Sequence, residues 1–461
     1  MRRASNIDMC NGPLLKNVIA YTIPIIITSL LQLLFNAADL VVVGQFCGSN
    51  SVAAVGATSA IVHLIVNFFA GFSMGVGVAM AQAIGSRDSE RVHQVVHTAM
   101  PISAISGVLV SLIGMLFSET FLRWMGTPTE ILDLSSLYLK VYFLGAFFNM
   151  VYSFGASLLR AAGDSKSPLY ILTIAGVVNV VFNIIFVTLF HMDVAGVALA
   201  TAISQALSAV LVVYALIHRE DECRFVMKAM RIYTRPLKKM ISVGLPSGIQ
   251  FCAFSLSNVL IQSSINSFGA AAVSGNAAGS NIEGFVYVCM NAFGQTSLNF
   301  AGQNIGAKKY ERLSKIMRTC LLCAFVAGVI TGGLAFLFKE PLLSFYITDS
   351  TEAIKFGVQR MTYICLTYFI CGMMDTMSGM LRGMGKSLHA MIISLMGACG
   401  LRVIFIMTLF KLPLFHSLDW LFMTYPISWI LCLIALLIAY KINKDRFMRN
   451  HLAQIDAIIK K

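Results

Sequence analysis

The sequence predicts an all-α polytopic membrane protein, in which twelve transmembrane helices form two pseudo-symmetric six-helix bundles. Two observations carry this prediction. First, 57% of the 461 residues are hydrophobic and only 12% are charged, whereas the charged fraction of a soluble globular protein is about twice as high. Second, the two halves of the chain resemble each other. The composition excludes a water-soluble globule, and the repeat predicts two related bundles.

Twelve segments are long and apolar enough to cross a bilayer, since a spanning helix needs about 20 largely apolar residues. Six lie in each half of the chain. In order, they are 14–45, 52–80, 92–117, 134–159, 167–190, 194–217, 240–267, 273–300, 313–338, 356–381, 388–410 and 418–440. Because six is an even number, the second half enters the membrane from the same side as the first. The halves are therefore predicted to be parallel repeats.

The repeat can be read directly from the residues. Residues 52–91 align with residues 273–312 when the sequence is shifted by 221 positions, and Pro24 aligns with Pro246 at a shift of 222. A half-chain repeat in an apolar protein is typical of a two-lobed membrane transporter.

The spans divide the chain into four expected regions. These are an N-terminal lobe (1–217), a cytoplasmic inter-lobe linker (218–239), a C-terminal lobe (240–441) and a cytoplasmic tail (442–461). The linker mixes basic and apolar residues, which suits a segment lying on the membrane interface. The tail is expected to be a second segment of this kind.

The loop charges predict the orientation. With both termini in the cytoplasm, 27 of the 34 Lys and Arg residues fall inside, 6 outside and 1 within a helix. This bias agrees with the positive-inside rule. We therefore attribute the net charge of +13 to basic residues that set the membrane topology and contact anionic lipid. We expect a multi-pass protein of the plasma (inner) membrane that does not bind nucleic acid.

No familiar catalytic motif is present. The sequence lacks the phosphate loop of nucleotide hydrolases, the zinc-protease H-E-x-x-H and the nucleophile motif G-x-S-x-G. A membrane-embedded enzyme would need a nucleophile or metal cluster, and none is found. The chain is therefore predicted not to be an enzyme and to need no cofactor.

Four charged residues lie well inside predicted spans: Asp39, Glu283, Asp375 and Arg402. Each costs about 2.5–3.5 kcal/mol on insertion scales unless it faces a cavity or a partner. Such residues are functional candidates. None of the three acids has an acidic counterpart in the other half, which suggests that the lobes divide the work.

Several motifs in order resemble one family. They are NAADLVVVGQF (36–46), QAIGSRDSER (82–91) with its echo GQNIGAKKYER (302–312), and the paired turns LLRAAGDSK (158–166) and MLRGMGKS (380–387). Together with twelve helices in two lobes, they resemble the MATE (multidrug and toxic compound extrusion) transporters over nearly the whole chain.

This resemblance implies a V-shaped pair of six-helix bundles and alternating access. It further implies secondary active export of amphiphilic organic cations in exchange for H⁺ or Na⁺. The expected partners are small cationic substrates and the lipid bilayer, and we expect the chain to function as a monomer. A lipid-linked precursor flippase of the related superfamily is the alternative, although it would more often have fourteen helices and a strongly cationic cavity.

The resemblance also implies a cation site in the first lobe. It matches Asp39 to the acid of the first helix, Asn179 and Asn183 to a polar pair four residues apart on the fifth, and Thr201 to a threonine on the sixth. Asn183 stands where many members carry Asp. A single carboxylate binds Na⁺ weakly, which favours H⁺ as the coupling ion. We therefore assign no metal to this site, although Na⁺ could bind there. The alternative role for the asparagines is hydrogen bonding between helices.

In the second lobe, Asp375 matches an acid that some members carry on the tenth helix, and Glu283 supplies another from the eighth. Arg402 is expected to neutralise one of these two acids. Either acid then binds substrate or protons, or is held in an internal ion pair with Arg402. Pro24 leaves a helix carbonyl without its usual donor and is the expected hinge of the first helix.

Overall fold

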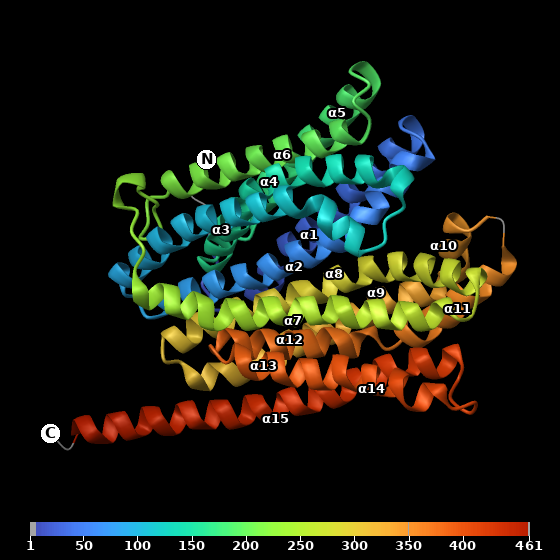
Figure 1. Ribbon diagram of the computed structural model, residues 1–461. Coiled ribbons are helices and arrows are strands. Elements are labelled where there is room, and N and C mark those ends of the chain that lie inside the picture. The colour runs from blue at the N-terminus through green and yellow to red at the C-terminus, as the bar shows by residue number, and fades with distance from the viewer. Residues whose placement is uncertain (1–5, 349, 460–461) are drawn as a thin grey trace. The chain divides into compact units, whose positions relative to one another are not determined.

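The computed structural model describes residues 6–348 and 350–459, which form helices joined by short turns, with no strand among them (Figure 1). The first half contains seven helical elements. They are α1 (Leu14–Phe46), α2 (Ser49–Gly85), α3 (Ser89–Trp124), α4 (Thr129–Ala161), α5 (Lys166–Ile184), the π-helix η1 (Ile185–Leu189) and α6 (Asp193–Ile217). The short η2 (Met227–Ala229) lies in the linker.

The second half repeats this order with more interruptions. Its elements are α7 (Thr234–Asn266), α8 (Ala270–Gly306), α9 (Tyr310–Leu337), α10 (Lys339–Tyr346), α11 (Thr351–Cys365), α12 (Tyr368–Gly383), α13 (Ser387–Ser394), the π-helix η3 (Leu395–Gly400), α14 (Leu401–Met407), η4 (Leu409–Lys411) and α15 (Leu418–Ile459).

The polytopic prediction is confirmed. Ten helices within the described residues are apolar and long enough to span a membrane, and α11 with α12 makes an eleventh span that bends by 47°. The remaining predicted span, 273–300, coincides with α8, a 37-residue helix rich in Asn, Ser and Gln. The expected surface segment after residue 441 is not separate, because α15 continues without a break to Ile459.

The duplication is also visible in the backbone. Gly48 and Gly269, which precede α2 and α8, have φ values of 89° and 92°. Arg87 and Lys308, which follow the same two helices, have φ values of 54° and 57°. A side chain at positive φ is uncommon. Its recurrence at a spacing of 221 residues therefore shows that both halves build the same turns.

The helices cluster into two compact units that cross the expected boundaries. Unit 1 comprises residues 1–7 and 23–248, and unit 2 comprises residues 8–22 and 249–461. The first part of α7 thus packs with the first half of the chain, and the first part of α1 with the second. The change of unit falls beside Pro24 in α1 and beside Pro246 in α7. The division at 217 and 240 as functional lobes remains a prediction.

Glycines explain why the first part of α7 belongs to unit 1. Gly71 and Gly75 of α2 face Gly244 and Gly248 of α7 so closely that a Cβ at Gly71 would lie 2.5 Å from the Gly248 amide nitrogen. Two small residues four apart on each helix let the backbones approach, which drives helix association within a bilayer. In unit 2, the first part of α1 packs on α8, where the Tyr21 hydroxyl accepts a 3.0 Å hydrogen bond from Asn299.

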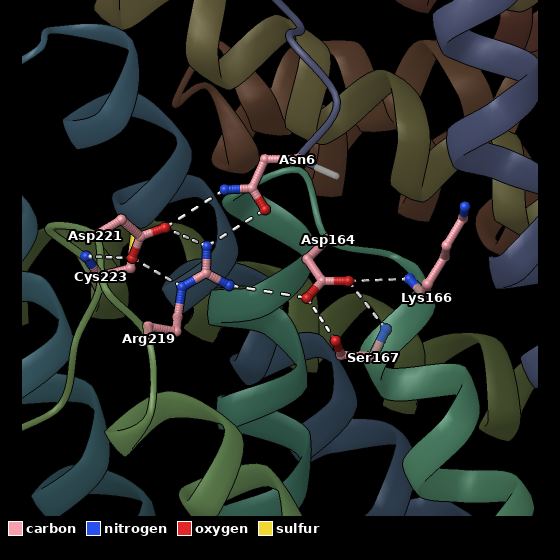
Figure 2. A network of polar contacts seen from close by, with 7 residues as sticks. All are labelled: Asn6, Asp164, Lys166, Ser167, Arg219, Asp221 and Cys223. Atoms are coloured by element: carbon pink, nitrogen blue, oxygen red, sulfur yellow. Dashed lines mark hydrogen bonds and ion pairs between the residues drawn. The ribbon is translucent and has the colours of Figure 1, made fainter. Parts of the chain in front are cut away.

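A polar network that includes the buried Asp164 fixes the start of the linker (Figure 2). The Arg219 guanidinium donates to Asp221 at 2.5 and 2.8 Å and lies 3.8 Å from an oxygen of Asp164. Asn6 also donates to Asp221, at 3.4 Å. Asp164 in turn accepts from the amide of Ser167, at 2.9 Å, in the first turn of α5. The network therefore joins the N-terminal arm, the turn before α5 and the linker.

The linker is less superficial than expected from the sequence. Phe225 is buried against the core of unit 1, and its neighbour Val226 donates its backbone N–H to Nε2 of His97 at 3.1 Å. Val226, Met227 and Met230 are exposed, as a segment lying on the membrane interface would require. The linker is thus anchored to unit 1 at Phe225, and the larger apolar side chains from Val226 to Met230 are exposed.

The glycine contact generates the first prediction. Gly75→Ala should lower the free energy of unfolding by about 1–3 kcal/mol, because the added methyl would overlap the carbonyl oxygen of Met240. Thermal unfolding of the purified protein in detergent measures this. Gly333→Ala is the matched control, since its methyl would meet no atom within 4 Å. Equal stability of the two variants would refute the proposed close contact.

The polar network generates a second prediction, with a pH dependence. Burial raises the pKa of Asp221, but hydrogen bonds and the charge of Arg219 outweigh it and hold the pKa below its ordinary value. A lowered folded pKa means that this stabilisation is present above the unfolded pKa of about 3.9 and is lost as pH falls through the folded value.

Arg219→Gln should therefore lower the free energy of unfolding by about 0.5–1 kcal/mol at neutral pH, because the Asp221 side chain is 39% exposed and solvent screens the pair, and the difference from wild type should shrink below about pH 4. Thermal unfolding across a pH series measures both effects. The exposed Arg224→Gln variant is the control and should be neutral. A difference that is unchanged at low pH would show that the ion pair is not its cause.

Candidate functional site

The four residues predicted to form the first-lobe site meet in unit 1. Asp39 of α1 accepts a hydrogen bond from the Nδ2 of Asn183 on α5. The same Nδ2 lies 3.4 Å from Oδ1 of Asn179, and Nδ2 of Asn179 lies 3.4 Å from the Thr201 hydroxyl of α6. Thr201 also hydrogen bonds with Asp39. Sequence spacing alone places the two asparagines on one face of α5, and the fold brings the other two residues to them.

A close helix contact sets this geometry. Gly176 of α5 packs directly against the ring of Phe35 on α1, where any Cβ would overlap the ring. Asp39 lies four residues after Phe35, and Asn179 and Asn183 lie three and seven residues after Gly176. Residues at these spacings share a helix face. The glycine therefore allows the carboxylate and the two amides to meet.

The charge of Asp39 has no cationic partner. It takes part in no ion pair among those found in the described residues, and it is partly buried. Asn179 and Asn183 are 4% and 0% exposed. Oδ1 of Asn183 has no hydrogen-bond partner in the described part of the chain. The site thus offers several oxygens and one formal negative charge, a set that suits a proton or a weakly bound hard cation.

Aromatic residues from α4 complete the surroundings of the carboxylate. Tyr138 and Tyr142 lie within electrostatic range of Asp39, and Tyr142 interacts with Gln205 of α6. None of these three residues was predicted from the sequence. The only available signal was their recurrence at helical spacing, which many lipid-facing or core residues share.

In the second unit, the predicted ion pair has a different partner. Glu283 of α8 binds Arg360 of α11 through two hydrogen bonds of 2.9 and 2.6 Å. Nη1 of Arg360 donates to Asn276 at 2.6 Å. The expectation that Arg402 neutralises Glu283 or Asp375 is therefore wrong: no ion pair of Arg402 is found among the described residues. The sequence does not single out Arg360, because it lies only about one turn inside the predicted span 356–381, where a cation is typical of the adjoining loop.

Asp375 and Arg402 have other surroundings. Asp375 of α12 hydrogen bonds with Tyr287 and lies within electrostatic range of Arg382, and its Oδ2 has no partner in the described residues. Arg402 of α14 donates from Nε to the Ser428 hydroxyl at 2.9 Å and stacks over the Tyr425 ring at 4.1 Å. The structure thus brings Glu283 to Arg360, and leaves Asp375 and Arg402 without direct contact to each other.

Comparisons with known proteins agree with this fold. The family model MatE matches residues 24–185 and again 246–408, so the two matches repeat the 222-residue shift. The chain is 26% identical over 396 residues to the probable multidrug resistance protein YoeA of Bacillus subtilis, covering 84% of this chain and 85% of that one.

A second Bacillus subtilis relative, the probable multidrug resistance protein YpnP, is 26% identical and covers 86% and 88% of the two chains. Among solved structures, an outward-facing multidrug resistance MATE family transporter of the MOP superfamily superposes with a TM-score of 0.90 at 21% identity, covering 97% of this chain and all of the other. The sequence matches in both halves and the shared fold lead to one conclusion: the chain belongs to the MATE family of membrane transporters.

Proposed function

We propose that this protein is a secondary active exporter that exchanges amphiphilic organic cations for incoming H⁺ or Na⁺ by alternating access. One observation carries the proposal: the Asp39 carboxylate lies within a membrane-spanning helix, accepts a hydrogen bond from the Asn183 amide and has no basic partner among the described residues. An unpaired intramembrane acid of this kind is typical of a coupling site. The named relatives, which are described as probable multidrug resistance proteins, support drugs as substrates, and the resemblance to the family implies organic cations.

The geometry supports competition between the coupling ion and the organic cation. Ionised Asp39 accepts a hydrogen bond from Asn183 and attracts a cation. Protonated Asp39 has no charge and becomes a hydrogen-bond donor, for which Oδ1 of Asn183 is an acceptor without a partner in the described residues. Each ligand thus favours a different hydrogen-bond pattern between α1 and α5. A ligand shifts a conformational equilibrium only through such a difference in affinity.

Helix α1 provides a route from this local change to the rest of the protein. It runs unbroken through Pro24, beside which the chain passes from unit 2 to unit 1. Proline removes a backbone hydrogen bond and allows a helix to bend. We assign Pro24 the role of hinge, and α7 carries its counterpart, Pro246.

The choice of coupling ion favours H⁺ over Na⁺ on chemical grounds. Na⁺ would take oxygens from Asp39, Asn179, Asn183 and Thr201, of which only the first is charged. A proton needs only the carboxylate and an acceptor. In the second unit, Glu283 is occupied by Arg360, so Asp375 is the acid that remains available for proton or substrate binding. We place both termini in the cytoplasm, as the loop charges predict.

The lipid-linked precursor flippase is less well supported. The named relatives are described as probable multidrug resistance proteins. We therefore keep drug export as the conclusion.

Export of a fluorescent organic cation from proteoliposomes, with the H⁺ and Na⁺ gradients collapsed separately, tests the proposal. Asp39→Asn should reduce gradient-driven export to the level of empty vesicles, because it keeps the shape and removes the titratable charge. The exposed Asp133→Asn of α4 is the matched control and should export normally. If Asp39→Asn exports at the wild-type rate and still responds to the gradient, Asp39 is not the coupling site.

The second-unit ion pair generates a separate prediction. Arg360→Gln should lower the yield of folded protein, since a buried acid left without its partner costs about 3–5 kcal/mol. Combining it with Glu283→Gln should restore much of the yield, which identifies the pair by a double-mutant cycle. Yield is measured by size-exclusion chromatography of the solubilised protein. If Asp375→Asn restores the yield of Arg360→Gln and Glu283→Gln does not, Asp375 is the partner of Arg360 and the assignment of Glu283 is wrong.

A further inference from the structure

The interior charges of unit 2 favour a negative ligand. Three arginines are buried in the described part of the protein, at 4–6% exposure, and all three lie in this unit: Arg360, Arg382 and Arg402. The acids facing them are the buried Glu283 and the partly buried Asp375. Unit 2 therefore holds one more positive than negative charge among these groups, the reverse of the unpaired carboxylate in unit 1.

The excess charge can be assigned to one residue. Arg360 is neutralised by its two hydrogen bonds to Glu283. Arg382 donates to Gln250 at 2.9 Å and lies within electrostatic range of Asp375. Within the described residues, Arg402 contacts the Ser428 hydroxyl and the rings of Tyr425 and Trp429, at 4.1 and 5.7 Å. Its Nη2 atom is buried and has no hydrogen-bond partner in the described residues.

These contacts do not compensate a full charge inside a membrane. An arginine stays protonated in a protein, and a stack on aromatic rings offsets only part of the penalty of burying it. The remaining N–H groups form a planar fork whose natural complement is a carboxylate or phosphate. Arg402 is the second residue after the π-helix η3, and π-bulges occur frequently at functional sites.

One face of α8 in this unit borders open space. Tyr287, which bonds Asp375, is partly exposed. Gly284 precedes it by three residues on α8 and so shares its helix face, and a Cβ at Gly284 would meet no atom within 4 Å.

We propose that Arg402, backed by the rings of Tyr425 and Trp429, binds an oxyanion group, either the carboxylate or phosphate of a transported organic cation or a free oxyanion. The inference rests on the proposed transport function and deepens it: a transported organic cation that also carries an acidic group would be recognised by unit 2 through that group, so that zwitterions are substrates. A purely cationic molecule would gain nothing from this site.

Two dyes that differ by one group test the proposal on the purified, full-length protein. Rhodamine 123 is a methyl ester with a net positive charge, and rhodamine 110 is the corresponding acid. Binding is measured by fluorescence anisotropy for wild type, Arg402→Gln and Arg402→Lys. We expect Arg402→Gln to weaken binding of the acid by about tenfold or more and to leave the ester unchanged, with Arg402→Lys intermediate because it keeps the charge without the fork.

Arg402→Gln should also fold, because it removes a charge that no acid pairs with among the described residues. Arg360→Gln, by contrast, leaves the buried Glu283 without its partner. The proposal is wrong if the variant weakens both dyes equally, or neither. Competition by inorganic phosphate in the anisotropy assay, together with export measurements, distinguishes an oxyanion group of the substrate from a free oxyanion. If Arg402→Gln also slows export of the acid dye from proteoliposomes, the oxyanion belongs to the substrate. If phosphate displaces only the acid dye and export does not depend on Arg402, the site holds a free oxyanion.

Export of the ester dye distinguishes failure of this inference from failure of the transport function. Loss of ester export in wild type would overturn the transport proposal, whereas a normal ester rate with no effect of Arg402 on the acid in either assay would overturn only the oxyanion site.

Discussion

A charge inside a bilayer has to be compensated by its neighbours, and the chemistry of this protein follows from how each internal charge meets that requirement. Glu283 and Arg360 compensate each other through two hydrogen bonds. Asp39 is stabilised by amide and hydroxyl groups, which leave its charge free to attract a cation. Arg402 rests on aromatic rings and one hydroxyl. The first arrangement supports structure, whereas the other two leave a binding capacity.

The two halves share a backbone and differ in their chemistry. Gly48 and Gly269 keep the same unusual φ, as do Arg87 and Lys308, and a glycine-mediated contact joins α2 to the first part of α7. The internal charges do not repeat: by the shifts that align the halves, Asp39 lies opposite Ile261, and Glu283 opposite Val62. Duplication thus supplies a symmetric scaffold, and the unequal charges let the units take different roles around one transport cycle.

Much of the fold could be predicted from the sequence, because spans and repeats are local or periodic properties. Each predicted span coincides with a helix or a broken helix, and Asp39, Asn179, Asn183 and Thr201 do meet. The errors concern relations that only packing decides. Arg360 lies close to a helix end, where sequence does not separate a loop cation from an interior one, and its partner depends on how α8 meets α11. The exchange of the first parts of α1 and α7 between units likewise depends on contacts far apart in sequence.

The central claim is that the coupling ion and the organic cation compete for Asp39, and proton release on substrate binding tests it most directly. A fluorescent cation is added to purified protein in lightly buffered, sodium-free solution while a pH indicator records the protons released. Competition predicts about half a proton released per cation bound at the pH at which Asp39 is half protonated, because half of the sites then carry the proton, and none from Asp39→Asn. Binding of equal affinity at every pH, without proton release and without competition by Na⁺, would contradict the account.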